Sequence, residues 1–165
     1  MSTSQQKTFS LRNLDEQDVS WIIEASNDLA IQQMTSHGGA QTQEAALSVI
    51  NCSNGDFKSW AILGDNKPLG VISIHSVDGL SATADVGYWV APWARRQGAA
   101  AAALRLLEKE LSSSPEIACI QLKIMNANEP SLALARSLGF EEVSSGSCSC
   151  GTQGEVSARV FEKKI

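Results

Sequence analysis

Positive charge and long apolar runs are both scarce in this sequence. Thirteen Lys and Arg residues stand against 18 Asp and Glu residues, for a formal net charge of -5. Binding to a nucleic-acid backbone depends on dense positive charge, so we expect no nucleic-acid partner. No apolar run approaches the roughly 20 residues that cross a bilayer, and Met1–Gln6 lacks the basic and apolar regions of a secretion signal. The sequence predicts no membrane segment and favours a cytoplasmic location.

Cysteine is also sparse, and its spacing does not match a zinc site. Only Cys148 and Cys150 lie close together, whereas Cys52 and Cys119 stand apart. A structural zinc ion needs two paired sets of ligands, and no nearby histidine supplies the second set. We therefore expect no metal and reduced thiols, as in most cytosolic proteins. The role of Cys148 and Cys150 stays open.

The length and the apolar content suit one globular domain. The chain has 165 residues, of which 43% are hydrophobic, and this is enough to bury a core of ordinary size. We expect a single domain over residues 1–165, as a monomer or a homodimer. The excess of acidic residues would favour a cationic acceptor, such as an amine.

Hydrophobic periodicity predicts an alternation of strands and helices. Three strands between Trp60 and Val90 are joined by short turns, which predicts an antiparallel meander. A helix with an apolar stripe follows, and the strand after it should run parallel to the last strand of the meander. The expected segments are strand 9–14, a helix after Asp15 that ends near Asn27-Asp28, helix 44–50 after Thr42, strands 60–63, 69–77 and 82–90, helix 100–111, strand 118–124, helix 131–138 between Asn128 and Gly139, and a loop over Ser144–Gly154.

The junction between strand 82–90 and helix 100–111 carries an anion-binding pattern, Arg95-Arg96-Gln97-Gly98-Ala99-Ala100. Free backbone N–H groups and the helix dipole at a helix N-terminus attract anions. Gly98 lets the backbone approach a phosphate closely, and the two alanines leave the first turn uncovered. The two arginines add positive charge. This segment is therefore predicted to bind a phosphate-bearing ligand.

Two blocks of the sequence resemble a known enzyme family. The stretch Val86-Gly-Tyr-Trp-Val-Ala-Pro-Trp-Ala-Arg-Arg-Gln-Gly-Ala-Ala100 resembles the acetyl-CoA motif of the GNAT acetyltransferase superfamily, in the form found in its RimJ/RimL-type branch. Asn128-Glu-Pro-Ser131, followed by Leu138-Gly139-Phe140, is similar to the Asn-x-x-Ser and Leu-Gly-Phe signatures of that branch. The resemblance spans roughly residues 9–143. It implies an α+β fold with a central mixed, mostly antiparallel sheet, flanked by helices and splayed between two parallel strands.

The resemblance also implies that acetyl-CoA is the co-substrate and enters between the splayed strands. Unpaired backbone groups there can hydrogen-bond to pantetheine as an added strand would. Trp89 and Val90 would lie against pantetheine, and Asn128 near the thiol. The pyrophosphate would be bound by Arg95, Arg96, Gln97, Gly98, Ala99 and Ala100.

Two side chains are candidates for the acyl-transfer chemistry, and each has a structural alternative. Asp85 matches a position where relatives carry a glutamate that deprotonates the amine, but its shorter side chain fits a polar residue on a sheet face equally well. Ser131 matches a serine near the sulfur, where it would donate a proton or stabilise the thiolate. Its hydroxyl would otherwise bond the backbone of its own helix. The resemblance makes the backbone N–H of Val90 the oxyanion donor.

Two further residues are weaker candidates for a role in the chemistry. His75 could be the base, although a lone histidine on a strand is more often structural, and water is a third choice. Tyr88 alternates with Asp85 along its strand, so it is expected to face away from Asp85 and to belong to the core.

The resemblance implies that a primary amine attacks acetyl-CoA directly in a ternary complex. The acceptor is either a small amine, such as an antibiotic, a polyamine or an amino-acid derivative, or the N-terminal amine of a protein or peptide. The alternative is a non-catalytic acyl-CoA-binding module, which would keep the anion-binding segment and lack a working acid and base. Asp85, Asn128 and Ser131 argue against that alternative.

Overall fold

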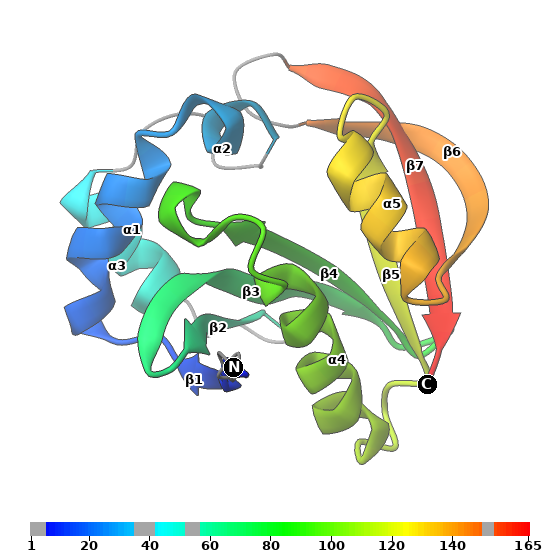
Figure 1. Ribbon diagram of the computed structural model, residues 1–165. Coiled ribbons are helices and arrows are strands. Elements are labelled where there is room, and N and C mark those ends of the chain that lie inside the picture. The colour runs from blue at the N-terminus through cyan, green and yellow to red at the C-terminus, as the bar shows by residue number, and fades with distance from the viewer. Residues whose placement is uncertain (1–5, 35–41, 52–56, 150–153) are drawn as a thin grey trace, which may run out of the picture.

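The computed structural model describes residues 6–34, 42–51, 57–149 and 154–165 (Figure 1). Cys52 and Cys150 lie outside these ranges. Within them the chain forms an α+β fold, as the sequence predicts. The elements are β1 (Phe9–Asn13), the 3-10 helix η1 (Glu16–Asp18), α1 (Val19–Ser26), α2 (Leu29–Met34), α3 (Gln43–Asn51), β2 (Lys58–Gly64), β3 (Lys67–Asp78), β4 (Thr83–Val90), the 3-10 helix η2 (Pro92–Ala94), α4 (Ala99–Ser112), β5 (Cys119–Met125), α5 (Glu129–Ser137), β6 (Glu141–Ser149) and β7 (Glu155–Lys164).

The described strands form one sheet in the order β1-β2-β3-β4-β5-β7-β6. Neighbouring strands run antiparallel except β4 and β5, which run parallel. β4 pairs with β5 only from Thr83 to Val86, opposite Cys119 to Leu122. Beyond this point the two strands diverge (Figure 1), and no described residue of β5 pairs with residues 87–90. The predicted splay between two parallel strands is therefore confirmed.

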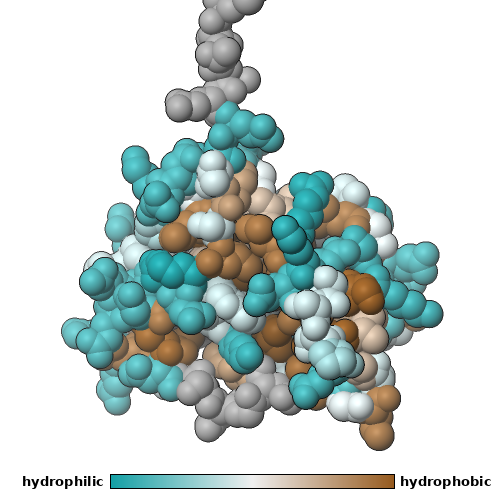
Figure 2. Space-filling model, turned by 90° about the horizontal axis from the view of Figure 1, so that it is seen from below, coloured by the Kyte–Doolittle hydropathy of each residue, from teal (hydrophilic) through white to brown (hydrophobic). Residues whose placement is uncertain are grey.

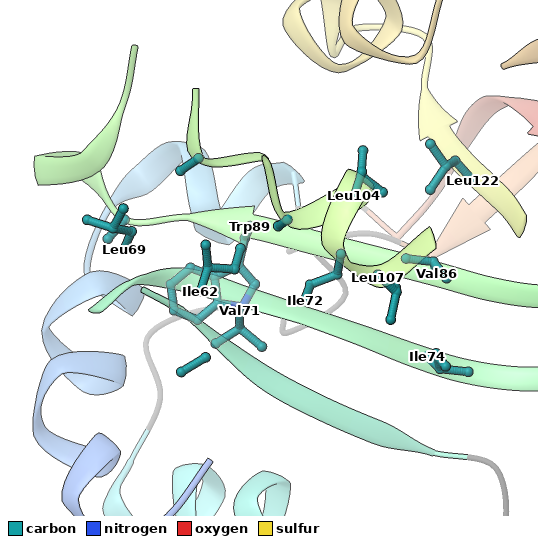
Figure 3. Packing of buried hydrophobic residues seen from close by; sticks show 14 of the residues in the cluster. Ile62, Leu69, Val71, Ile72, Ile74, Val86, Trp89, Leu104, Leu107 and Leu122 are labelled. Atoms are coloured by element: carbon teal, nitrogen blue, oxygen red, sulfur yellow. The ribbon is translucent and has the colours of Figure 1, made fainter. Parts of the chain in front are cut away.

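Helices cover both faces of the sheet. α4 packs across β1 to β4, and Figure 3 shows its Leu104 and Leu107 beside Ile72 and Val86. The opposite face carries Trp89, whose ring centroid lies 5.8 Å from that of Trp21 in α1. Because side chains alternate along β4, Val86 and Trp89 belong to different faces, so α1 and α4 cover opposite sides.

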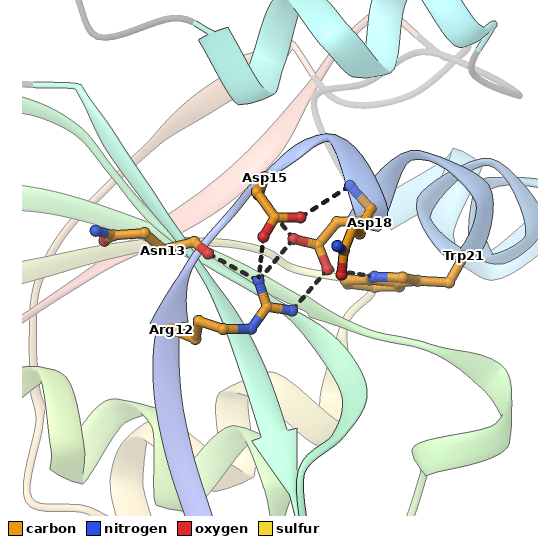
Figure 4. A network of polar contacts seen from close by, with 6 residues as sticks. Arg12, Asn13, Asp15, Asp18 and Trp21 are labelled. Atoms are coloured by element: carbon orange, nitrogen blue, oxygen red, sulfur yellow. Dashed lines mark hydrogen bonds and ion pairs between the residues drawn. The ribbon is translucent and has the colours of Figure 1, made fainter.

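A buried carboxylate, Asp18, fixes the junction of β1 and α1 (Figure 4). Arg12 donates two hydrogen bonds to it, at 2.8 and 3.0 Å, and the indole N–H of Trp21 donates a third at 2.7 Å. The backbone N–H of Asp15 donates a fourth at 2.8 Å, which completes a capping box. Burial alone would raise the pKa of the Asp18 carboxyl, but these donors together hold that pKa below its usual value.

The predicted loop over Ser144–Gly154 is wrong for its described residues. β6 extends to Ser149 and pairs antiparallel with β7, a strand that the sequence did not reveal. β6 is an edge strand whose side chains are almost all exposed, so it has no apolar alternation to mark it. Its small Ser, Gly and Cys side chains are tolerated because the backbone of β7 supplies the pairing.

The surface is mixed rather than uniformly polar. On the face seen in Figure 2, hydrophobic side chains reach the surface in patches among hydrophilic ones. Among the described residues, the large hydrophobic side chains that are exposed are Leu29, Leu80, Trp93 and Val143. No helix in the described ranges has the length and apolar content needed to span a bilayer.

Candidate active site

A cavity of about 540 Å³ lies where β4 and β5 separate. Asp85 and Trp89 line it from the face of the sheet that α1 covers, and Val86 and Tyr88 line it from the face that α4 covers. Leu122, on the last paired position of β5, completes the wall between them. The cavity therefore reaches both faces of the sheet at the gap between the strands.

On the face covered by α4, three polar side chains come together. Asn128 caps α5, and its Oδ1 accepts a hydrogen bond from the Ser131 backbone N–H at 3.4 Å, as the sequence predicts. The Tyr88 hydroxyl donates a hydrogen bond to Ser131 Oγ at 3.0 Å. All three residues line the cavity. Burial raises the pKa of the Tyr88 phenol, so this hydroxyl keeps its proton well above neutral pH.

The prediction that Tyr88 serves only the core misses its contact with Ser131. The ring does pack against the core cluster, and Tyr88 does alternate with Asp85 along β4. However, its hydroxyl reaches the N-terminal turn of α5, which follows β5 in the chain. The predicted parallel pairing of β4 with β5 could have indicated this contact, because it brings the segment after β5 alongside the unpaired half of β4.

On the opposite face, the two candidate bases lie next to each other. His75 Nδ1 is 3.8 Å from Asp85 Oδ2, and both side chains are partly exposed. The His75 ring lies over Gly87, where a Cβ would come within 2.5 Å of His75 Cε1. Phe57 stacks on that ring, with centroids 6.3 Å apart and planes 9° apart. The sequence proposed Asp85 and His75 as alternatives, and the structure makes them neighbours.

The cavity also has an apolar wall, whose member Phe57 stacks on His75, the neighbour of Asp85. This wall is built from helices α1 to α3 and from the segments that precede and follow them in the chain. Among the described residues, its members are Leu14, Ile22, Met34, Val49 and Phe57. An amine whose nitrogen approaches Asp85 would therefore place an apolar substituent against these side chains.

The segment from Arg95 to Ala100, hereafter the 95–100 loop, leads from the divergent end of β4 into α4. Gly98 caps the helix in the left-handed region, with φ of +79°, a conformation that glycine adopts at little cost. A Cβ at Gly98 would meet nothing within 4 Å, so the backbone here is open to an approaching group. The first N–H groups of α4 have no partner within the helix and can bind an anion.

Long-range contacts position two side chains of the 95–100 loop. Arg95 forms an ion pair with Asp28, with a nitrogen–oxygen distance of 2.5 Å. Gln97 donates to the Trp93 carbonyl at 3.1 Å and accepts a hydrogen bond from Lys7. Local sequence patterns do not indicate the contacts of Asp28 and Lys7, because 67 and 90 residues separate them from their partners.

The remaining predicted cofactor contacts lie at the end of β4. Trp89 lines the cavity and is largely buried beneath the Trp21 ring. Val90 follows it and pairs with Gly70 of β3 on the side away from β5. Among the described residues, no three His, Cys, Asp or Glu side chains are grouped so that they could hold a metal ion.

Comparisons with known proteins identify a domain family. A family model described as an acetyltransferase (GNAT) domain matches residues 9–141. No curated protein matches the chain in sequence.

Solved structures share this fold at low sequence identity. RimL, a ribosomal L7/L12 alpha-N-protein acetyltransferase, is 22% identical with a TM-score of 0.83, over 99% of this chain and 92% of its own. RimJ from Mycobacterium smegmatis, in complex with CoA-disulfide, is 19% identical with a TM-score of 0.83, over 95% and 82% of the two chains. The microcin C7 self-immunity acetyltransferase MccE, in complex with acetyl-CoA and AMP, is 21% identical with a TM-score of 0.81, over 95% and 92%.

Proposed function

The chain belongs to the GNAT acetyltransferase family, and on that premise we propose that it transfers an acetyl group from acetyl-CoA to the primary amine of an acceptor bound beside Asp85. The observation that carries this proposal is the cavity between β4 and β5, which is lined from both faces of the sheet. A ternary complex needs such a space, because donor and acceptor must be held together with the amine next to the thioester carbon.

The residues along the passage fit acetyl-CoA. Residues 87–90 lack partners on β5, so their backbone groups can hydrogen-bond to the amides of pantetheine. Trp89 and Val90 would contact pantetheine, and Asn128 would lie near the thiol end. Residues Arg95, Arg96, Gln97, Gly98, Ala99 and Ala100 would hold the pyrophosphate on the open N-terminus of α4. Lys7, which donates to Gln97, adds positive charge beside them.

Each group at the junction of the two faces then has a distinct task. Acetyl-CoA supplies the acetyl group as a thioester. Asp85 accepts the proton that the ammonium group of the acceptor loses, directly or through water. The Val90 N–H donates to the thioester oxygen as nitrogen bonds to the carbonyl carbon. As the carbon–sulfur bond breaks, its electron pair stays on the sulfur, and Ser131 stabilises this thiolate by donating a hydrogen bond to it. The second proton of the attacking nitrogen passes to the thiolate or to water, so that an amide and CoA leave.

The apolar wall favours an acceptor whose amine is close to an apolar group. The α-amine of a peptide that begins with a hydrophobic residue has this character, as does a small amine with an apolar substituent. An α-amine has a pKa of about 7.7 to 8.0, against about 10.4 for a lysine side chain. An α-amine therefore needs a weaker base than a lysine side chain does, and a short carboxylate such as Asp85 is sufficient for it.

A panel of matched acceptors tests this proposal. CoA release is measured with a peptide that begins with leucine, the same peptide beginning with aspartate, an Nα-acetylated lysine peptide and spermidine. The leucine peptide should be acetylated fastest, and Val49→Asp, which places a charge on the apolar wall, should reduce that preference. Faster acetylation of spermidine would instead assign the site to cationic small amines, and the absence of CoA release with every acceptor, despite binding of acetyl-CoA, would indicate a non-catalytic acyl-CoA-binding module.

A further inference from the structure

We propose that Tyr88 is a positioning residue for Ser131: its hydroxyl occupies an acceptor site on Ser131 Oγ and so leaves the serine proton free to point at the sulfur of bound CoA. This inference rests on the proposed function. It concerns how the hydroxyl at the sulfur is oriented, which the backbone of α5 alone does not determine.

Serines at the C-terminal ends of helices in this chain show one local bond that a helical serine can form. The hydroxyls of four serines in or at the end of helices donate to the backbone carbonyl three residues earlier, at 2.8 to 2.9 Å. Such bonds are the usual local habit of serine in helices. These serines are Ser26, Ser112, Ser113 and Ser137.

Ser131 departs from that pattern. Its Oγ accepts from Tyr88 at 3.0 Å, and its hydroxyl proton has no acceptor among the described residues. A hydroxyl has one proton to donate and two lone pairs to accept with. Since Tyr88 uses one lone pair and Ser131 itself lines the cavity, the free proton is available to a ligand in the cavity.

Tyr88 is well placed to orient a partner and poorly placed to give up its own proton. It stands on the part of β4 that has no partner on β5, and its ring packs against the core. Burial raises the pKa of its phenol, so ionisation of Tyr88 is disfavoured across the range in which an amine acceptor is active. Ser131 is in turn fixed from the backbone side by Asn128.

The test is a double-mutant cycle in which the pKa of the thiol of bound CoA is measured in addition to turnover. The ultraviolet absorbance of the thiolate is followed while bound CoA is titrated with pH in wild type, Tyr88→Phe, Ser131→Ala and the double variant. Ser131→Ala should raise the pKa of the bound thiol. Tyr88→Phe should raise it by about half a unit, roughly a threefold change in the thiolate equilibrium. The double variant should match Ser131→Ala.

The cycle removes the influence of other charges that line the cavity, namely His75, Asp85 and Lys123, because these are common to all four proteins. Tyr88→Phe should also lower kcat about tenfold in wild type and have no further effect in Ser131→Ala, with the KM for acetyl-CoA unchanged. Independent, additive effects of the two substitutions on the thiol pKa would overturn the inference.

One further measurement keeps the result decisive. A fluorinated tyrosine at position 88 keeps the ring and makes a stronger donor, so it should lower the pKa of the bound thiol; an unchanged or raised pKa would overturn the inference even if Tyr88→Phe did not fold. The titration needs no acceptor. Absence of turnover with every amine would therefore defeat the proposed function while the thiol pKa still decided the role of Tyr88, and failure of CoA to bind would defeat both.

Discussion

The guanidinium of Arg95 lies 2.5 Å from the carboxylate of Asp28, so an ion pair joins the 95–100 loop to the start of α2. The hydrogen bond from Arg95 is the main reason that the pKa of Asp28 is held below its usual value. Asp28 also accepts a hydrogen bond from the Ile31 N–H at 3.1 Å, so it caps α2 as well. One carboxylate therefore links the helix on the acceptor side with the loop that we assign to the pyrophosphate.

Asp28→Asn should strengthen the binding of CoA. Asparagine caps a helix about as well as aspartate does, while loss of the carboxylate frees Arg95 for the pyrophosphate and removes a repulsive charge. At a protein surface such a charge is worth about 0.5 to 1 kcal/mol, or roughly two- to fivefold in affinity. Titration calorimetry should show this gain at low salt and a smaller gain at high salt.

Glu110→Gln, an equal change in charge near the far end of α4, is the control for Asp28→Asn and should have little effect. Weaker CoA binding by Asp28→Asn would show that Asp28 holds Arg95 in its binding orientation, and that this outweighs the repulsion.

Asp18→Asn should destabilise the protein by about 3 kcal/mol, because Arg12 would lose its ionised partner in a buried site. The folded-state pKa of Asp18 is lowered, so its contribution is complete above the unfolded value of about 3.9 and is lost as the pH falls through the folded value. Urea unfolding at several pH values measures this. The exposed control Glu24→Gln should change little, and a loss that did not shrink in acid would contradict the assignment.

The local parts of the site could be predicted from the sequence. Asn128 was predicted to cap a helix, and it caps α5. The segment around Gly98 was predicted to join a strand to a helix, and α4 begins directly after Gly98. The parallel arrangement of β4 and β5 also followed, because a single helix connects them.

Contacts between distant segments could not be predicted from local patterns. Tyr88 and Ser131 are 43 residues apart, and only the three-dimensional path of β5 into α5 joins them. The proximity of His75 to Asp85 depends on an irregularity in the β3–β4 register between Ile74 and Ser76, which no periodicity shows. The strand β6 could not be predicted from hydrophobic periodicity, because an exposed edge strand needs no alternating apolar residues.

Ser131→Ala should lower kcat by roughly one to several powers of ten and leave the affinity for acetyl-CoA nearly unchanged, because the hydroxyl acts on the sulfur as the carbon–sulfur bond breaks. Steady-state kinetics and titration calorimetry separate the two quantities. Ser137→Ala is a matched control in the same helix, since its hydroxyl only bonds the Leu134 carbonyl. Equal turnover in both variants would reduce Ser131 to a packing role.

Activity should rise with pH and favour an α-amine over a lysine-type amine of similar structure. At neutral pH an α-amine is partly free, whereas a lysine-type amine is almost wholly protonated. The comparison is kcat/KM for both amines from about pH 6 to about pH 9. Asp85→Asn should lower both values, while Asp78→Asn at the exposed end of β3 should not. A preference for the lysine-type amine at neutral pH that Asp85→Asn abolishes would make Asp85 a strong base.

The most direct test measures acetyl-CoA binding in the presence of a chelator together with the products formed from acetyl-CoA and a leucine-initiated peptide. Wild type should bind acetyl-CoA and yield CoA and Nα-acetylated peptide in equal amounts. Gly98→Glu, which brings a negative side chain to the helix start, should fold, bind no acetyl-CoA and yield neither product. Gly98→Asn, which tolerates the left-handed conformation, should retain binding. Tight binding of acetyl-CoA by wild type without any N-acetylated product would contradict an acetyltransferase function for this site.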